Sequence, residues 1–156
     1  MSGLYEDPLA PRRGNIFLHP GFRYGFIGAV VAIFINLALF LMFAGDETGD
    51  RLAWALQLSV YVFVSRAAAE NQYNRNIREG GMEHLRGVQA AGLGAGLVTS
   101  TLVWLYLVIR GIIRDEFFVE PVSMCFFIFI DVLIAMGLGA WSGKSVSNKY
   151  RIDQFE

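Results

Sequence analysis

The residue with most potential for chemistry is an aspartate at the middle of an apolar run. Asp131 lies within FFIFIDVLIAMGLG, residues 126–139, and no basic residue accompanies it there. A carboxyl group in the hydrocarbon region of a membrane is costly and often marks a proton or ion site. The alternative is a protonated carboxyl that holds helices together through hydrogen bonds. The sequence leaves both interpretations open.

Other polar side chains are expected at the level of Asp131. When the four apolar segments described below are each centred on a bilayer, every segment brings at least one polar group to the midplane. A polar group facing lipid chains is unfavourable, so these groups should turn inward and meet. The predicted midplane polar cluster consists of Asn36, Gln57, Tyr61, Thr99, Ser100 and Asp131.

The remaining motifs for chemistry are weak. GLGAG, residues 92–96, has the composition of a phosphate-binding loop, but it follows no strand and lies inside an apolar segment, which favours helix packing. His19 and His84 share no ligand spacing, and the single cysteine, Cys125, excludes an internal disulfide or a CxxC site. We therefore predict a protein that is not an enzyme and holds neither a metal ion nor another cofactor.

Four apolar segments are long enough to position these residues in a membrane. A helix needs roughly 20 apolar residues to cross the hydrocarbon core, and 54% of the 156 residues are hydrophobic. The sequence predicts an all-α membrane protein, a four-transmembrane-helix bundle. The spans are expected at about residues 22–44, 52–69, 88–110 and 121–142, within a transmembrane domain (22–143) that follows an N-terminal arm (1–21) and precedes a C-terminal tail (144–156).

Glycines spaced three or four residues apart indicate close helix packing. The third and fourth spans run antiparallel, so their glycines lie at matching depth and allow the two backbones to approach, as GxxxG patterns do in membranes. The predicted packing glycines are Gly92 and Gly96 in the third span, Gly139 and Gly143 in the fourth, and Gly25 and Gly28 in the first.

The distribution of positive charge predicts the orientation of the chain. Of the 13 Lys and Arg residues, only Arg51, Arg110 and Arg114 lie in or next to the loops after the first and third spans; the others lie in or next to the N-terminal arm, the loop after the second span and the C-terminal tail. Because basic segments stay in the cytoplasm, both termini are expected there, in the inner (plasma) membrane of a bacterium. The net charge of −1 argues against a nucleic-acid partner.

The loop between the second and third spans is expected to form a short cytoplasmic helical hairpin. The second helix has no breaker before Gly80 and Gly81, and MEHLRG, residues 82–87, should begin a new helix after them. This loop should contact solvent and anionic lipid headgroups. Its charged residues include Arg75, Arg78, Glu83 and Arg86.

These patterns favour two functions. The first is a structural or accessory subunit of a larger membrane complex or homo-oligomer, because the extramembrane parts are small, no catalytic constellation is found, and the packing glycines exceed what one bundle needs. Its partners would be the lipid bilayer and other membrane subunits or copies of itself. The alternative is a small carrier or channel for a proton, an ion or a lipid-linked solute, which would use the midplane polar cluster around Asp131.

The charge distribution predicts that Thr48 and Asn74 lie on opposite sides of the membrane. In a Cys125→Ser background, Thr48→Cys should react with an impermeant maleimide from the outside and Asn74→Cys only from the cytoplasm. Labelling of both positions from the same side would contradict the four-span topology.

Overall fold

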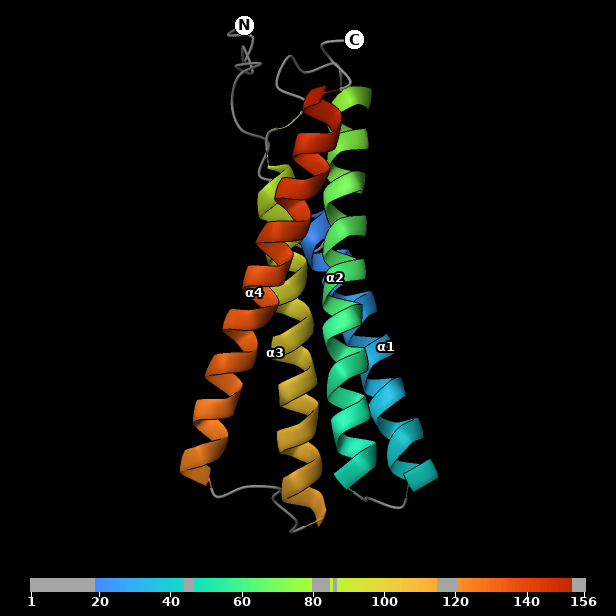
Figure 1. Ribbon diagram of the computed structural model, residues 1–156, viewed down its shortest axis with the longest axis vertical. Helices are drawn as coiled ribbons and strands as arrows, with labels where there is room; N and C mark the ends of the chain where they lie inside the picture. The colour runs from blue at the N-terminus through green and yellow to red at the C-terminus, as the bar shows by residue number, and fades with distance from the viewer. Residues whose placement is uncertain (1–18, 44–46, 80–84, 86, 115–120, 153–156) are drawn as a thin grey trace, which may run out of the picture.

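The computed structural model contains four long helices and describes residues 19–43, 47–79, 85, 87–114 and 121–152 (Figure 1). The helices are α1 (Pro20–Phe43), α2 (Glu47–Arg78), α3 (Val88–Arg114) and α4 (Pro121–Ile152). Each contains a stretch that is long and apolar enough to span a membrane. The prediction of an all-helical chain with four membrane-length helices is therefore confirmed.

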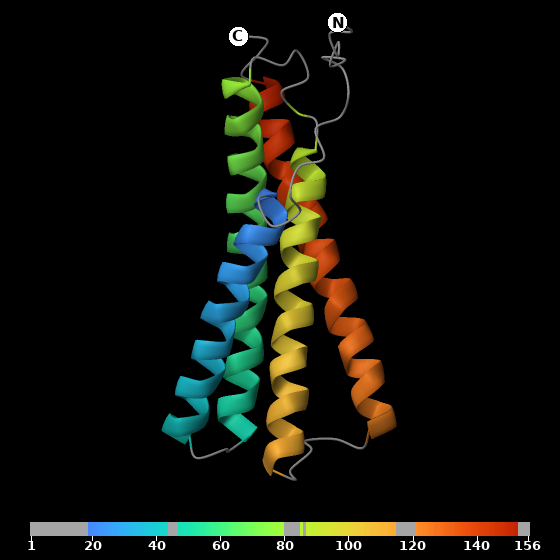
Figure 2. The same ribbon diagram turned by 180° about the vertical axis from the view of Figure 1, so that it is seen from behind.

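α2 and α3 form the centre of the bundle. Each contacts the other as well as both α1 and α4, whereas α1 and α4 do not meet in the described part of the chain. Seen from behind, α1 and α4 lie on opposite sides of α3, and the lower half of α4 leans away from the other helices (Figure 2). In α4, 17% of the apolar stretch is buried, against 33% in α2 and in α3. The helix that carries Asp131 is thus the least covered of the four.

Two helices continue beyond the predicted spans. α2 runs past residue 69 to Arg78, as the lack of a helix breaker predicts, and α4 runs past residue 142 to Ile152. Figure 1 shows these two ends side by side at the top of the bundle. The rings of Tyr73 and Tyr150 stack there with centroids 3.8 Å apart. This contact joins α2 and α4 at the end where α1 and α3 begin.

The predicted hairpin between α2 and α3 is described only in part. Leu85 and Gly87 lie in turns before α3 begins. Gly87 has a φ of 72°, which glycine adopts without strain, and its carbonyl accepts a hydrogen bond from the Ala91 N–H. The expected helix restart at MEHLRG, with Glu83 and Arg86, lies outside the described residues.

α3 and α4 are in backbone contact through their glycines. A Cβ atom at Gly92 would lie 2.6 Å from the carbonyl oxygen of Gly139, and a Cβ atom at Gly143 would lie 2.7 Å from a Cα atom in the first turn of α3. At Gly96 a Cβ atom would overlap the carbonyl oxygen of Ala135. Any side chain at these levels would push the two helices apart.

The glycines of α1 serve a similar contact. A Cβ atom at Gly25 would lie 2.6 Å from Val98 on α3, and one at Gly28 would lie 2.8 Å from both Thr99 on α3 and Val64 on α2. All six predicted packing glycines are therefore covered by helices of the same chain. The expectation that these glycines exceed the needs of one bundle is wrong, because each of them packs within this bundle.

Gly96 and Gly137 offer a matched test of close packing. Gly96→Ala should force α3 away from α4 and lower the stability by about 1–3 kcal/mol, the usual cost of overpacking. Gly137 lies in α4, and nothing lies within 4 Å of its Cβ position, so Gly137→Ala should keep or raise the stability because alanine favours helix over glycine. Thermal unfolding of both variants in one detergent measures the difference, and equal midpoints would contradict the contact at Gly96.

Candidate functional site

Asp131 turns into the bundle from α4. Its side chain is 2% exposed, whereas Phe129 and Leu133 on the same helix are 62% and 50% exposed. Residues four apart lie on one face of a helix, and Ala135, one turn after Asp131, is also buried. The inward stripe of α4 therefore carries the carboxyl group, and the outward stripe carries large apolar side chains.

Four side chains contact one oxygen of Asp131. Oδ2 lies 2.7 Å from the Tyr61 hydroxyl, 2.8 Å from Trp104 Nε1, 3.1 Å from Ser100 Oγ and 3.4 Å from Gln57 Nε2. The indole and amide N–H groups can only donate. Oδ2 is therefore the acceptor oxygen of the carboxyl group, held by donors from α2 and α3.

The other oxygen of Asp131 is different. Oδ1 is buried and has no hydrogen-bond partner among the described residues. Buried polar atoms are nearly always paired, and an exception points to a water molecule, an ion or a functional role. The two oxygens of one carboxyl group thus lie in unlike surroundings.

The network reaches α1 through Gln57. Asn36 Nδ2 lies 3.5 Å from Gln57 Oε1 and 2.9 Å from the carbonyl oxygen of Ala32 on its own helix. Gln57 Nε2 also makes a short contact with the hydroxyl of Tyr61. Hydrogen bonds therefore connect polar side chains of all four helices.

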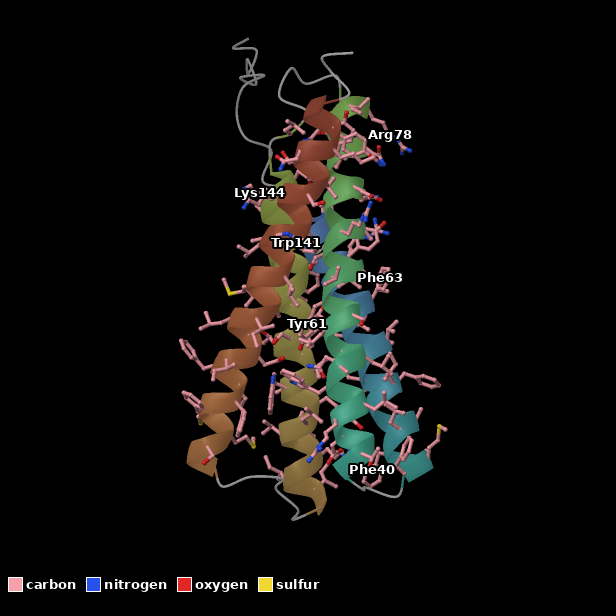
Figure 3. The ribbon with its side chains drawn as sticks, in the orientation of Figure 1. Phe40, Tyr61, Phe63, Arg78, Trp141 and Lys144 are labelled. Atoms are coloured by element: carbon pink, nitrogen blue, oxygen red, sulfur yellow. The ribbon has the colours of Figure 1, made fainter. Side chains whose placement is uncertain are left out.

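Two nearby residues on α2 show a polar side chain that faces the bundle and an apolar side chain that faces outward. Figure 3 shows Tyr61 pointing into the centre of the bundle and Phe63 pointing outward from the same helix. Their exposed fractions are 0% and 73%. The polar side chain is buried and the apolar one is exposed, which is the arrangement that suits a lipid surround.

Thr99 does not join the network around Asp131. Its hydroxyl donates to the carbonyl oxygens of Gly25 on α1, at 3.0 Å, and of Ala95, at 2.8 Å. Successive residues point about 100° apart on a helix, so Thr99 faces α1 while Ser100 faces Asp131. The other five members of the predicted midplane polar cluster are connected to one another.

Trp104 belongs to the network around Asp131 but is not among the residues predicted from the sequence. A tryptophan near the end of an apolar segment suggests a place at the membrane interface, but its indole N–H points at Asp131. Trp104 follows Ser100 by four residues and so shares its helix face. That spacing is the signal that could have found it.

The predicted hairpin residues Arg75 and Arg78 lie at the far end of α2, away from Asp131. Arg75 Nε pairs with Glu79 Oε1 at 2.8 Å, and Arg66 pairs with Glu70 at 3.2 Å. Both pairs are exposed and four residues apart, a geometry that contributes only a few tenths of a kcal/mol. These charges belong to the surface of α2.

Two further observations bear on the chemistry. No group of three or more His, Cys, Asp or Glu residues that could hold a metal ion occurs in the part of the chain that the structure describes. The chain matches no protein-family model, no curated protein and no solved structure. Any proposal for the function of this chain therefore rests on the geometry around Asp131.

Trp104→Phe tests the network, because it keeps an aromatic side chain of smaller size and removes the N–H donor. It should lower the stability by roughly 0.6–2 kcal/mol, the range for hydrogen bonds between membrane helices. In an Asp131→Leu background the same change should cost clearly less stability, since the acceptor is already gone and only the loss of ring volume remains. Thr99→Val is the control: its effect should be the same in both backgrounds. An equal loss from Trp104→Phe in both would contradict the hydrogen bond.

Proposed function

We propose that this chain is a small non-enzymatic integral membrane protein that acts as a structural or accessory subunit of a larger membrane complex or a homo-oligomer. The observation that carries the proposal is that buried polar side chains pair with one another. Those at the midplane contact one another inside the bundle, and large apolar side chains cover much of the outer surface. A protein built in this way presents helices to its surroundings and keeps its polar atoms for folding.

α4 supports this proposal. Phe126, Phe127 and Phe129 are 62%, 50% and 62% exposed, on the half of α4 that leans away from the other helices (Figure 1). Aromatic side chains bury large areas and carry much of the binding energy at protein interfaces. We expect a transmembrane helix of another subunit to pack on this face of α4.

The same proposal includes an orientation. Arg75, Arg78, Lys144 and Lys149 lie toward the extended ends of α2 and α4, and basic residues favour the cytoplasm. We therefore place this end in the cytoplasm and the opposite loops outside, in the inner membrane of a bacterium.

Purification in a mild detergent, followed by native mass spectrometry, tests the subunit role. Wild-type protein should be recovered with another membrane protein or as an oligomer. Phe126→Ala combined with Phe129→Ala should weaken that assembly, because the change truncates the exposed aromatic face of α4. The matched control combines Phe34→Ala with Phe63→Ala, at positions 71% and 73% exposed on α1 and α2, and should leave the assembly intact. The proposal would be wrong if the wild-type protein were a monomer both in detergent and after cross-linking in membranes.

A second candidate is a small carrier or channel for a proton, an ion or a lipid-linked solute. The observation that favours it is the unpartnered, buried Oδ1 of Asp131. Asp131→Asn separates the two functions, since the amide keeps the size and hydrogen bonding of the side chain but cannot titrate. A structural role predicts unchanged assembly and no effect on ion movement. A carrier role predicts loss of flux in proteoliposomes by a folded variant.

A further inference from the structure

The buried side-chain atoms without a hydrogen-bond partner are not scattered over the molecule. Among the described residues all of them lie on α2 or α4, and none on α1 or α3. They are Ser65 Oγ, Gln72 Oε1, Asp131 Oδ1 and Ser142 Oγ. Such atoms are rare in folded proteins, and internal water molecules commonly satisfy them. All four belong to two neighbouring helices, and this shared position points to a common cause.

Two contacts set the levels of the seam between α2 and α4. Near the middle of the bundle, the Tyr61 hydroxyl on α2 donates to Asp131 on α4. At the extended end, Tyr73 stacks on Tyr150. Since α2 and α4 run in the same direction, residues between these two contacts lie between the same two levels on both helices.

The unpartnered atoms follow this seam from the middle to the extended end. Ser65 is one turn beyond Tyr61, and its Oγ lies 3.4 Å from the Cβ position of Gly96 on α3, which itself packs on Ala135 of α4. Ser142 lies one turn before Val146, which packs against α2. Gln72 comes last, and its amide donates to Asn76 Oδ1 at 2.8 Å, which leaves Oε1 unpaired.

These atoms are too far apart to pair with one another along the helix axis. Asp131 and Ser142 are eleven residues apart, which corresponds to about 16 Å at the helical rise. A hydrogen bond spans about 3 Å. Ser65 and Ser142 are nevertheless 0% and 3% exposed, so lipid and bulk solvent do not reach them. Small molecules that both donate and accept hydrogen bonds would satisfy all four atoms.

We propose that a file of internal water runs between α2 and α4, from the level of Gln72 and Ser142 to Asp131, and that it delivers protons to Oδ1. The file ends at Asp131, because the Gln57, Tyr61, Ser100 and Trp104 side chains fill the other side of the carboxyl group. Access is therefore from one end only. The physiological role of this water file rests on the second candidate function, the carrier or channel. The ion that it would carry is the proton.

The chemistry around Asp131 selects a proton over a metal cation. A metal cation requires several oxygen ligands with available lone pairs, but the neighbours of Asp131 direct N–H and O–H groups toward Oδ2. A proton needs a single basic oxygen, and Oδ1 is that oxygen. An excess proton on the first water passes from water to water, or through a serine hydroxyl that accepts one proton and releases another. The last water holds the excess proton and gives it to Oδ1, where an O–H bond forms; the water and the carboxyl group are then both neutral.

Reaction of introduced thiols with Ag⁺ tests the file directly, because this ion is small and reacts with thiols in water. In a Cys125→Ser background, Ser65→Cys and Ser142→Cys should be blocked at least about tenfold faster than Val103→Cys, since apolar sites stay dry. Val103 is 0% exposed and packs against apolar residues of α1 and α2. Maleimide labelling after denaturation counts the thiols that remain. Equal rates for Ser65→Cys and Val103→Cys would overturn the proposal.

Infrared spectroscopy provides a second readout that needs no cysteine. Wild-type protein should show a carboxyl C=O band at low pH that Asp131→Asn lacks, and this band should shift on transfer to heavy water. Ser142→Val replaces the hydroxyl with an apolar group of similar size and should slow the shift, whereas Thr99→Val, outside the seam, should not. A shift that is equally fast in Ser142→Val, or no such band at any pH, would overturn proton delivery.

Proton flux across proteoliposomes is measured separately. Fast thiol reaction and a slowed shift in Ser142→Val without any flux would support the water file and remove the carrier function. Flux in a protein whose Ser65→Cys thiol reacts no faster than Val103→Cys would keep the carrier function and overturn the file.

Discussion

Four hydrogen-bond donors on α2 and α3 converge on Oδ2 of Asp131, and the position of α4 depends on this interaction. For helices surrounded by lipid, apolar side chains gain little by moving from lipid to a helix interface, so close packing and hydrogen bonds must hold the helices together. An unpaired carboxyl group facing lipid would be costly. The requirement to bury Asp131 therefore sets the rotation of α4 about its own axis, with Phe129 on the outer surface.

The glycine contacts support the same arrangement by another means. Gly139 follows Asp131 by two turns on the same face of α4, and its backbone lies against Gly92 of α3. Once Asp131 faces inward, helical periodicity directs Gly139 inward as well, so the polar contact and the backbone contact agree. Toward its other end α4 has exposed aromatic side chains instead, and there it leans away from the bundle (Figure 2).

The seam between α2 and α4 differs from the rest of the bundle in its polar atoms. Elsewhere the bundle pairs or exposes its polar atoms, but here Ser65, Ser142 and Oδ1 of Asp131 are buried without partners among the described residues. Proteins break such local rules chiefly at functional sites. A hydrated seam would combine a stable fold, held by Oδ2, with a titratable oxygen that the fold does not use. Structural and proton-binding roles can therefore coexist on one side chain.

The sequence by itself determined the four long apolar helices, the inward direction of Asp131 and the close approach of α3 to α4, because hydropathy and helical periodicity are local properties of the chain. Only the tertiary structure decided that Ser100 and not Thr99 meets Asp131, that Trp104 is a donor, and that Gly96 packs on Ala135. Those outcomes depend on how far each helix is rotated and shifted against its neighbours. Rotation and shift follow from the contacts of several helices at once, and no single segment of the sequence contains that information.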